Sequence, residues 1–181
     1  MSADQDKALA RRFVAEVMNA GNLAAADEFI APNLVVHNPV PGQAPGREGF
    51  KQTLTTLRNA FPDLHFTIED LLADGDKVMI RSTYRGTHRG ELLGFPPTGK
   101  PVAVMGIDLL RVADGKIVEH WGTYDQMEML HQLGVLPSPG GRLLALIPWI
   151  QRLVVPVSLT GLGLVIGYAL GTWRSMRDAR K

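Results

Sequence analysis

The stretch Asp114-Gly115-Lys116-Ile117-Val118-Glu119-His120-Trp121-Gly122-Thr123-Tyr124-Asp125 decides the fold class of this chain. Its Asp-Gly pair is typical of a tight turn between antiparallel strands, and the β-branched and aromatic residues that follow predict a strand. Successive side chains of a strand point to opposite faces, so His120 and Trp121 should face opposite ways. Asp125 shares the face of Trp121 in this count, and a β-bulge would reverse the assignment of the two faces.

Further strands lie before this stretch and are linked by hairpins. Alternating apolar residues predict strands at 64–69, 78–84 and 102–112, with an Asp74-Gly75-Asp76 turn between the first two. The Gly- and Pro-containing residues 86–99 predict a long loop that forms a lid or rim. After the last strand, residues 125–133 predict a short helix that ends at Gly134.

Helices dominate the first 60 residues. The spacing of apolar residues predicts helices at 8–18, with Gly21 as the C-cap, at 23–30 and at 47–60, and a short strand at 34–37. Helices followed by hairpin-linked strands predict an α+β fold. We expect a strongly curved antiparallel sheet that wraps around the N-terminal helices and forms a cone with one open end.

Composition excludes several classes of function. The 181 residues carry a net charge of +1, and no basic stretch with interleaved aromatic residues occurs in the first 140, so we expect no nucleic-acid partner. The chain has no cysteine, which excludes disulfides, thiolate catalysis and cysteine-ligated metals. Its five histidines show no HExxH or His-x-His spacing, so we expect no metal site. Neither a phosphate-binding glycine loop nor a Gly-x-Ser-x-Gly motif is present.

The composition changes at residues 136–141, Leu-Pro-Ser-Pro-Gly-Gly, which have the character of a linker. We divide the chain into a domain at 1–136, a linker and amphipathic segment at 137–152, a candidate transmembrane helix at 153–173 and a basic tail at 174–181. The third segment carries no charged residue. At about 1.5 Å per residue, a helix of its length would cross a hydrocarbon core of about 30 Å.

The first residues contain acids and lack an apolar core, so we expect no signal peptide. We expect the domain to be cytoplasmic and to associate with the membrane through the C-terminal hydrophobic helix. The alternative is that this C-terminal segment packs against a second copy of the chain in a homodimer.

Several motifs, in their order along residues 5–137, resemble the SnoaL-like polyketide or ester cyclase family of the nuclear transport factor 2-like superfamily. The most specific is the stretch 114–121 with Asp125 four residues on; the others are Val36-His37-Asn38-Pro39, Phe61-Pro62-Asp63-Leu64, Pro97-Thr98-Gly99-Lys100 and Gln132-Leu133-Gly134. The resemblance implies an intramolecular aldol cyclisation that needs neither a cofactor nor a metal. In such a reaction an aspartate that closes the last strand removes a proton next to a carbonyl group, and this aspartate matches Asp125.

Asp125 and Asp108 are the two acidic candidates for proton transfer. An aspartate at the mouth of an apolar cavity is well placed to remove a proton, whereas the alternative for Asp125 is an N-cap of the helix that follows. Asp108 interrupts an apolar strand, and a charge there must either be paired or face the cavity. Relatives often carry a histidine on this strand, so Asp108 is a departure. Its alternative is an ion pair with Arg81 or Arg85.

His37, at the end of the first predicted strand, is a third catalytic candidate. It could orient a carbonyl group or move a proton, and the alternative is a hydrogen bond to the neighbouring loop. We expect substrate contacts from Trp121, Asn38, Tyr84 and His120. His65 and His88 are expected on the surface.

Three functions fit these residues. The first is a membrane-tethered enzyme for an apolar carbonyl compound, with Asp125 as general base and Asp108 or His37 as its assistant. The second is a membrane-anchored module that binds an apolar ligand without catalysis. The third is an epoxide hydrolase with Asp108, Arg111 and Asp125 around a water, although Arg111 falls on the strand face opposite Asp108. Convergence of Asp125 with a second polar group in one cavity would favour the first.

Overall fold

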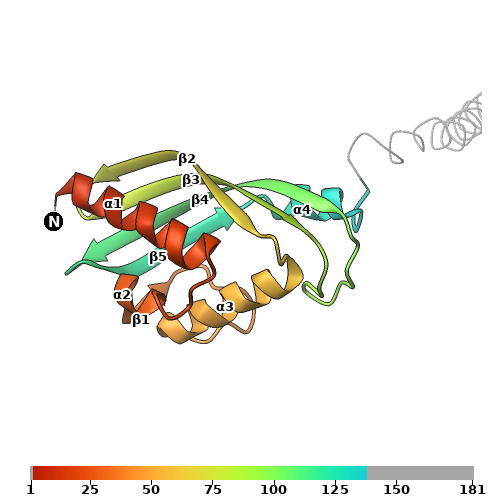
Figure 1. The fold of residues 1–181 in the computed structure, drawn as a ribbon, viewed down its shortest axis with the longest axis horizontal. Helices are drawn as coiled ribbons and strands as arrows, with labels where there is room; N and C mark the ends of the chain where they lie inside the picture. Colours follow the sequence, from red (N-terminus) through yellow and green to blue (C-terminus); the bar gives the residue numbers. More distant parts are fainter. Residues whose placement is uncertain (1, 138–181) are drawn as a thin grey trace, which may run out of the picture. The chain divides into compact units, whose positions relative to one another are not determined.

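The computed structural model describes residues 2–137 and has the expected α+β composition (Figure 1). A compact unit of the chain ends at Leu136. The elements, in chain order, are α1 (Ala3–Phe13), a π-helix η1 (Val14–Asn19), α2 (Ala26–Phe29), β1 (Ile30–Val36), α3 (Gly46–Ala60), β2 (His65–Asp74), β3 (Lys77–Thr87), β4 (Pro101–Ala113), β5 (Lys116–Tyr124) and α4 (Gln126–Leu133).

The five strands form one curved sheet in the order β1-β5-β4-β3-β2. The four strands after α3 pair antiparallel with one another, and the predicted tight turns join β2 to β3 and β4 to β5. The expectation of an antiparallel sheet throughout is wrong for β1, which lies parallel to β5. The chain passes through α3 between β1 and the rest of the sheet, so no hairpin turn determines the direction of β1.

The N-terminal boundaries differ from the sequence expectations. Helix α1 begins five residues before the predicted start at residue 8, because the Ser2 hydroxyl and the Gln5 side chain form a capping box. Strand β1 begins at Ile30, inside the predicted second helix, and contains Pro32. Proline is tolerated there because β1 is an edge strand of the sheet.

One face of the sheet is buried beneath the helices. Along β4, Val102, Val104 and Leu110 point into this core, whereas Met105 on the opposite face is 51% exposed. Helix α1 contacts β2 and β3, and α3 contacts β1, so the helices cover the two halves of the sheet (Figure 1). The strand alternation thus supplies one face for the core and a second face that is open among the described residues.

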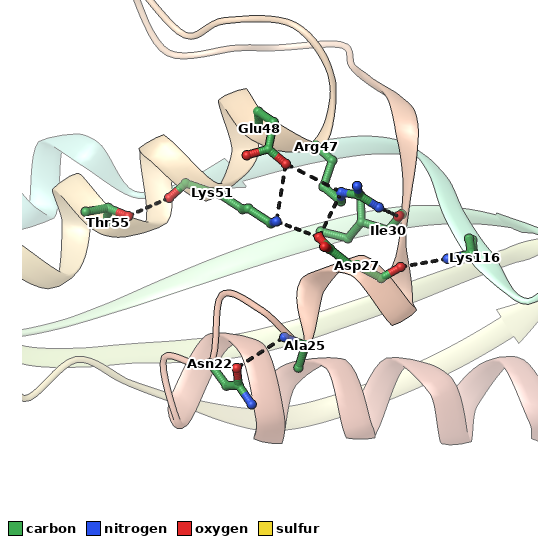
Figure 2. A network of polar contacts seen from close by, with 9 residues as sticks. All are labelled: Asn22, Ala25, Asp27, Ile30, Arg47, Glu48, Lys51, Thr55 and Lys116. Atoms are coloured by element: carbon green, nitrogen blue, oxygen red, sulfur yellow. Dashed lines mark hydrogen bonds and ion pairs between the residues drawn. The ribbon is translucent and has the colours of Figure 1, made fainter.

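A group of ionic contacts fastens α3 to α2 (Figure 2). The Asp27 carboxylate accepts from the Lys51 ammonium and lies 3.0 Å from the Arg47 guanidinium, and the Asp27 backbone carbonyl accepts from Lys116 of β5 at 2.7 Å. The hydrogen bond from Lys51 holds the pKa of Asp27 below its ordinary value. This group holds the N-terminal end of α3 in place, and apolar side chains of α3 pack into the core.

Among residues 2–137, no helix is both long enough and apolar enough to cross a membrane. The predicted C-terminal hydrophobic helix at 153–173, the amphipathic segment and the basic tail lie outside the described residues, apart from Pro137.

Candidate active site

A largely apolar cavity of about 160 Å³ lies between the inner face of the sheet and the helices. A smaller adjoining space of about 50 Å³ shares part of its lining. Helix α3 contributes Phe50, Leu54 and Leu57, and β4 contributes Val102 and Val104. Both spaces are bordered by Asp108 and His120, and the larger one also by Tyr84, Tyr124 and Asn38.

Asp108 of β4 is joined to two other side chains at this cavity. Its Oδ1 lies 2.8 Å from Nε2 of His120, and its Oδ2 accepts a hydrogen bond from the Tyr84 hydroxyl at 2.6 Å. The Asp108 and His120 side chains are 22% and 18% exposed. We refer to these three residues as the Asp108 triad.

The strand register explains why the triad forms. Asp108 lies directly opposite Gly122 of β5, so His120 is its diagonal neighbour on the same face. Tyr84 comes from β3, the strand on the other side of β4, and its ring lies over Gly106. A Cβ at Gly106 would approach the Tyr84 hydroxyl to 2.6 Å, so the bare glycine makes room for this ring.

The triad differs from the alternative pairing proposed for Asp108. Arg81 donates to Asp70 at 2.6 Å and Arg85 donates to Thr67 at 3.2 Å, so neither arginine pairs with Asp108. Burial raises the pKa of the Tyr84 hydroxyl, and the nearby Asp108 charge raises it further. The phenol therefore remains a hydrogen-bond donor across the physiological pH range.

Nδ1 of His120 is buried and has no hydrogen-bond partner among residues 2–137. An N–H group at this position would be left without an acceptor, and an unpaired buried donor is costly. The geometry therefore favours the tautomer in which Nε2 carries the proton and donates it to Asp108.

His37 and Trp121 lie on the opposite face of the sheet from the triad. Their rings stack with centroids 4.1 Å apart, and neither residue lines the cavity. His37 Nε2 is 2.6 Å from Glu119, which also accepts from Arg111. These two hydrogen bonds, that of His37 first, lower the pKa of Glu119. The prediction that His120 and Trp121 lie on opposite faces of the sheet is thus confirmed, and His120 is the one that faces the cavity.

Asp125 lies at the start of α4 and does not join the triad. Its carboxylate accepts from the Glu128 backbone N–H at 2.8 Å, which is an N-cap bond, and the residue is exposed. It does not line the cavity. Its role as a base stays a prediction, whereas the capping role is present in the structure. The epoxide hydrolase arrangement is not assembled either, because Arg111 bonds Glu119 on the other face.

Asn38 borders the cavity, as expected of a substrate contact, but its amide is bonded to the backbone of Gly122 in both directions. The surface expectation is wrong for His88, which is fully buried. Its Nδ1 accepts from the Thr98 backbone N–H at 3.2 Å. His65 is exposed, as predicted.

Sequence reasoning named the three residues of the triad but did not join them. Asp108 was a candidate acid, and Tyr84 and His120 were substrate contacts. It missed Gly106 and Gly122, because their contribution is to leave space for the side chains of the triad and they carry no functional group of their own. Within residues 2–137, no three His, Asp or Glu side chains are arranged to hold a metal ion.

An apolar cavity beneath a curved sheet, with a carboxylate, an imidazole and a phenol joined at its wall, defines an α+β domain that can bind a small molecule and transfer a proton. The model of the SnoaL-like polyketide cyclase family matches residues 8–133, and the chain belongs to this family.

Relatives agree with this assignment. Aklanonic acid methyl ester cyclase of Streptomyces peucetius is 34% identical in an alignment of 140 residues that covers 74% of this chain and 94% of the relative. Nogalonic acid methyl ester cyclase of Streptomyces nogalater is 31% identical over 121 residues, covering 64% of this chain and 88% of the relative. The solved structure of TsrD from Streptomyces laurentii superposes with a TM-score of 0.69 at 29% identity, covering 75% of this chain and 99% of TsrD.

Proposed function

We propose that this protein is a cofactor-free cyclase that closes a ring in an apolar carbonyl compound, with Asp108 as the general base. The observation that carries the proposal is the hydrogen-bonded Asp108 triad at the wall of an apolar cavity. The family and the two ester cyclases that this chain resembles support the class of reaction.

The proposed reaction is an intramolecular aldol addition. The Asp108 carboxylate takes a proton from the carbon next to a carbonyl group, and the electron pair of the broken C–H bond forms an enolate. The enolate carbon then bonds to a second carbonyl carbon of the same molecule, whose oxygen becomes an alkoxide. Protonated Asp108 returns its proton to that oxygen, so the product is an isomer of the substrate and Asp108 is regenerated.

His120 and Tyr84 orient the base in this scheme. Each donates to a different oxygen of Asp108, and this leaves a lone pair on each oxygen for the substrate proton. The apolar lining suits a hydrophobic substrate. A bound substrate would displace water from the Asp108 triad and so strengthen the electrostatic interactions there.

The experiment compares Asp108→Asn and Asp125→Asn with the parent chain, using aklanonic acid methyl ester and nogalonic acid methyl ester as probes. Ring closure is followed by chromatography of a product of unchanged mass. Loss of a positioned base costs about 10²–10⁴-fold in turnover, and we expect this loss for Asp108→Asn. Asp125→Asn should retain turnover, because Asp125 does not line the cavity. Its melting temperature should be nearly the same, because asparagine is also a good N-cap.

The opposite result, with turnover lost in Asp125→Asn and kept in Asp108→Asn, would make Asp125 the base. Failure of the parent chain to convert either ester, together with tight binding of both, would favour a binding module over an enzyme.

We also propose that residues 153–173 tether the domain to a membrane. This proposal is supported by the sequence of the segment, which is uncharged over the length of a bilayer-spanning helix. Such a tether would keep the cavity close to substrates that partition into lipid.

A further inference from the structure

We propose that Asn38 is a positioning residue of the Asp108 triad, which acts through the backbone of Gly122 rather than by contact with the substrate. The inference rests on the proposed function and adds to it the residue that fixes the geometry of the base.

Asn38 holds the backbone of β5 at the triad. Its side-chain amide donates to the Gly122 carbonyl, and its Oδ1 accepts from the Gly122 N–H at 2.9 Å. One residue earlier, the His37 backbone N–H donates to the His120 carbonyl at 2.9 Å. Consecutive bonds from residues 37 and 38 therefore fix β5 from His120 to Gly122, which is the segment that carries the imidazole.

Gly122 lies directly beneath the contact between Asp108 and His120. A Cβ placed on this glycine would lie 2.9 Å from Asp108 Oδ1 and 2.9 Å from His120 Nε2. Both atoms of the hydrogen bond thus approach the bare Cα closely. A shift of this backbone by a few tenths of an ångström would press on the pair or draw the imidazole away from the carboxylate.

The same two-bond clamp occurs elsewhere in the domain, away from the triad. The Gln132 side-chain amide accepts from the Ala103 N–H at 2.7 Å and donates to the Ala103 carbonyl at 3.0 Å. Ala103 is on β4, as Asp108 is, but its exposed side chain points away from the cavity. Gln132→Ala therefore removes bonds of the same kind without touching the residues that hold His120, and it is a matched control.

The first measurement is the turnover of the two methyl esters by Asn38→Ala, Gly122→Ala and Gln132→Ala in the full chain. A small misplacement of catalytic groups can cost on the order of 10–100-fold. We expect kcat of Asn38→Ala and Gly122→Ala to fall by this amount with little change in KM, and Gln132→Ala to keep the parent kcat. A rise in KM alone for Asn38→Ala would show a substrate contact and overturn the proposal.

The second measurement is independent of any substrate. Two-dimensional ¹⁵N–¹H spectra of the histidine rings report which ring nitrogen carries the proton, and His120→Gln identifies the His120 signals. We expect the Nε2–H tautomer in the parent chain and in Gln132→Ala, and a mixture of tautomers in Asn38→Ala and Gly122→Ala. Parent-like His120 signals in Asn38→Ala would overturn the proposal.

The two measurements separate the inference from the proposed function. If the parent chain converts neither ester, the proposed function fails while the histidine spectra still decide whether Asn38 positions His120. If Asn38→Ala does not fold, Asn38→Asp decides by the same readouts, because it keeps the acceptor for the Gly122 N–H and loses the donor to the Gly122 carbonyl.

Discussion

Asp108 shows how a single charge is accommodated on the apolar face of a sheet. An unpaired carboxylate in such a place would be strongly destabilising, but both of its oxygens accept a hydrogen bond, one from His120 and one from Tyr84. These donors come from the strands on either side of β4, so three neighbouring strands must be in register before the carboxylate is satisfied. The arrangement of the triad is therefore a product of the sheet as a whole.

Tyr84→Phe tests the contribution of the phenol. It removes one donor and leaves Asp108 Oδ2 without its partner, which should lower the free energy of unfolding by about 1–3 kcal/mol. Turnover should fall as well, because one of the two bonds that orient the carboxylate is lost. Denaturant unfolding and ester turnover measure the two effects.

Tyr124→Phe is the control for Tyr84→Phe. Tyr124 also borders the cavity and is largely buried, which raises its pKa, but it makes no hydrogen bond to Asp108. Equal losses in both variants would show that the effect comes from the cavity wall and not from the bond to Asp108.

The side chains that face the cavity could be predicted only in part. If residues of β4 and β5 are paired one by one from the Asp114-Gly115 turn, Asp108 is placed opposite Trp121. The β-bulge between Arg111 and Val112 shifts the register by one residue, so Asp108 lies opposite Gly122 and shares its face with His120. No glycine or proline marks the position of this bulge in the sequence. Alternation alone therefore predicts that His120 and Trp121 lie on opposite faces, but not which of them shares a face with Asp108.

At the scale of elements, hairpin strands were easier to predict than β1. Strands β3 to β5 follow from their alternating residues, and the Asp114-Gly115 turn joins β4 to β5. Strand β1 pairs with β5, whose paired residues are 84–87 positions further along the chain, and its Pro32 is a residue that argues against a strand. Only the tertiary structure, in which β1 is an edge, resolves this conflict.

The connection between β3 and β4 also differs from a simple surface loop. The His88 ring packs against Phe61 with centroids 5.3 Å apart, and the His88 backbone bonds to Lys100 and Gly99 on the returning chain. Burial of the ring lowers the pKa of His88. The loop is thus attached to the wall of the cavity, since Phe61 lines it.

The lowered pKa of His88 predicts a pH dependence of stability. Between its folded value and the ordinary value of about 6.5, the unfolded chain binds a proton that the folded chain does not. The free energy of unfolding therefore rises with pH through this range: the contribution is fully present above the ordinary value and is lost as pH falls below it.

We expect His88→Asn to reduce this dependence, because the asparagine Oδ1 takes the position of Nδ1 and can accept from the Thr98 backbone N–H but does not titrate in this range. Denaturant midpoints of the parent chain and the variant at pH 7.5 and pH 5 measure the effect. An equal drop in both chains would show that another group causes the acid sensitivity.

At the scale of the whole molecule, the chain joins a folded domain to an uncharged C-terminal segment. The domain has its own core, which extends from α1 to α4. Residues 153–173 carry no charge, and glycines recur at 163, 167 and 171, a pattern typical of helices that pack closely in lipid. The glycines and Pro156 make the segment only moderately apolar, so its insertion should be sensitive to a single charge.

The full chain should sediment with lipid vesicles and require detergent for extraction, whereas a chain that ends at Leu136 should stay in the supernatant. Leu164→Arg places a charge near the centre of the segment, at a cost of about 2.5–3.5 kcal/mol in mid-bilayer, and should release the full chain from the vesicles. Gln151→Arg adds the same charge just outside the segment and should leave sedimentation unchanged, which separates insertion from a general effect of charge. A full chain that stays in the supernatant without detergent would contradict the membrane tether. The homodimer alternative then predicts a larger sedimentation coefficient for the full chain that is lost when it ends at Leu136.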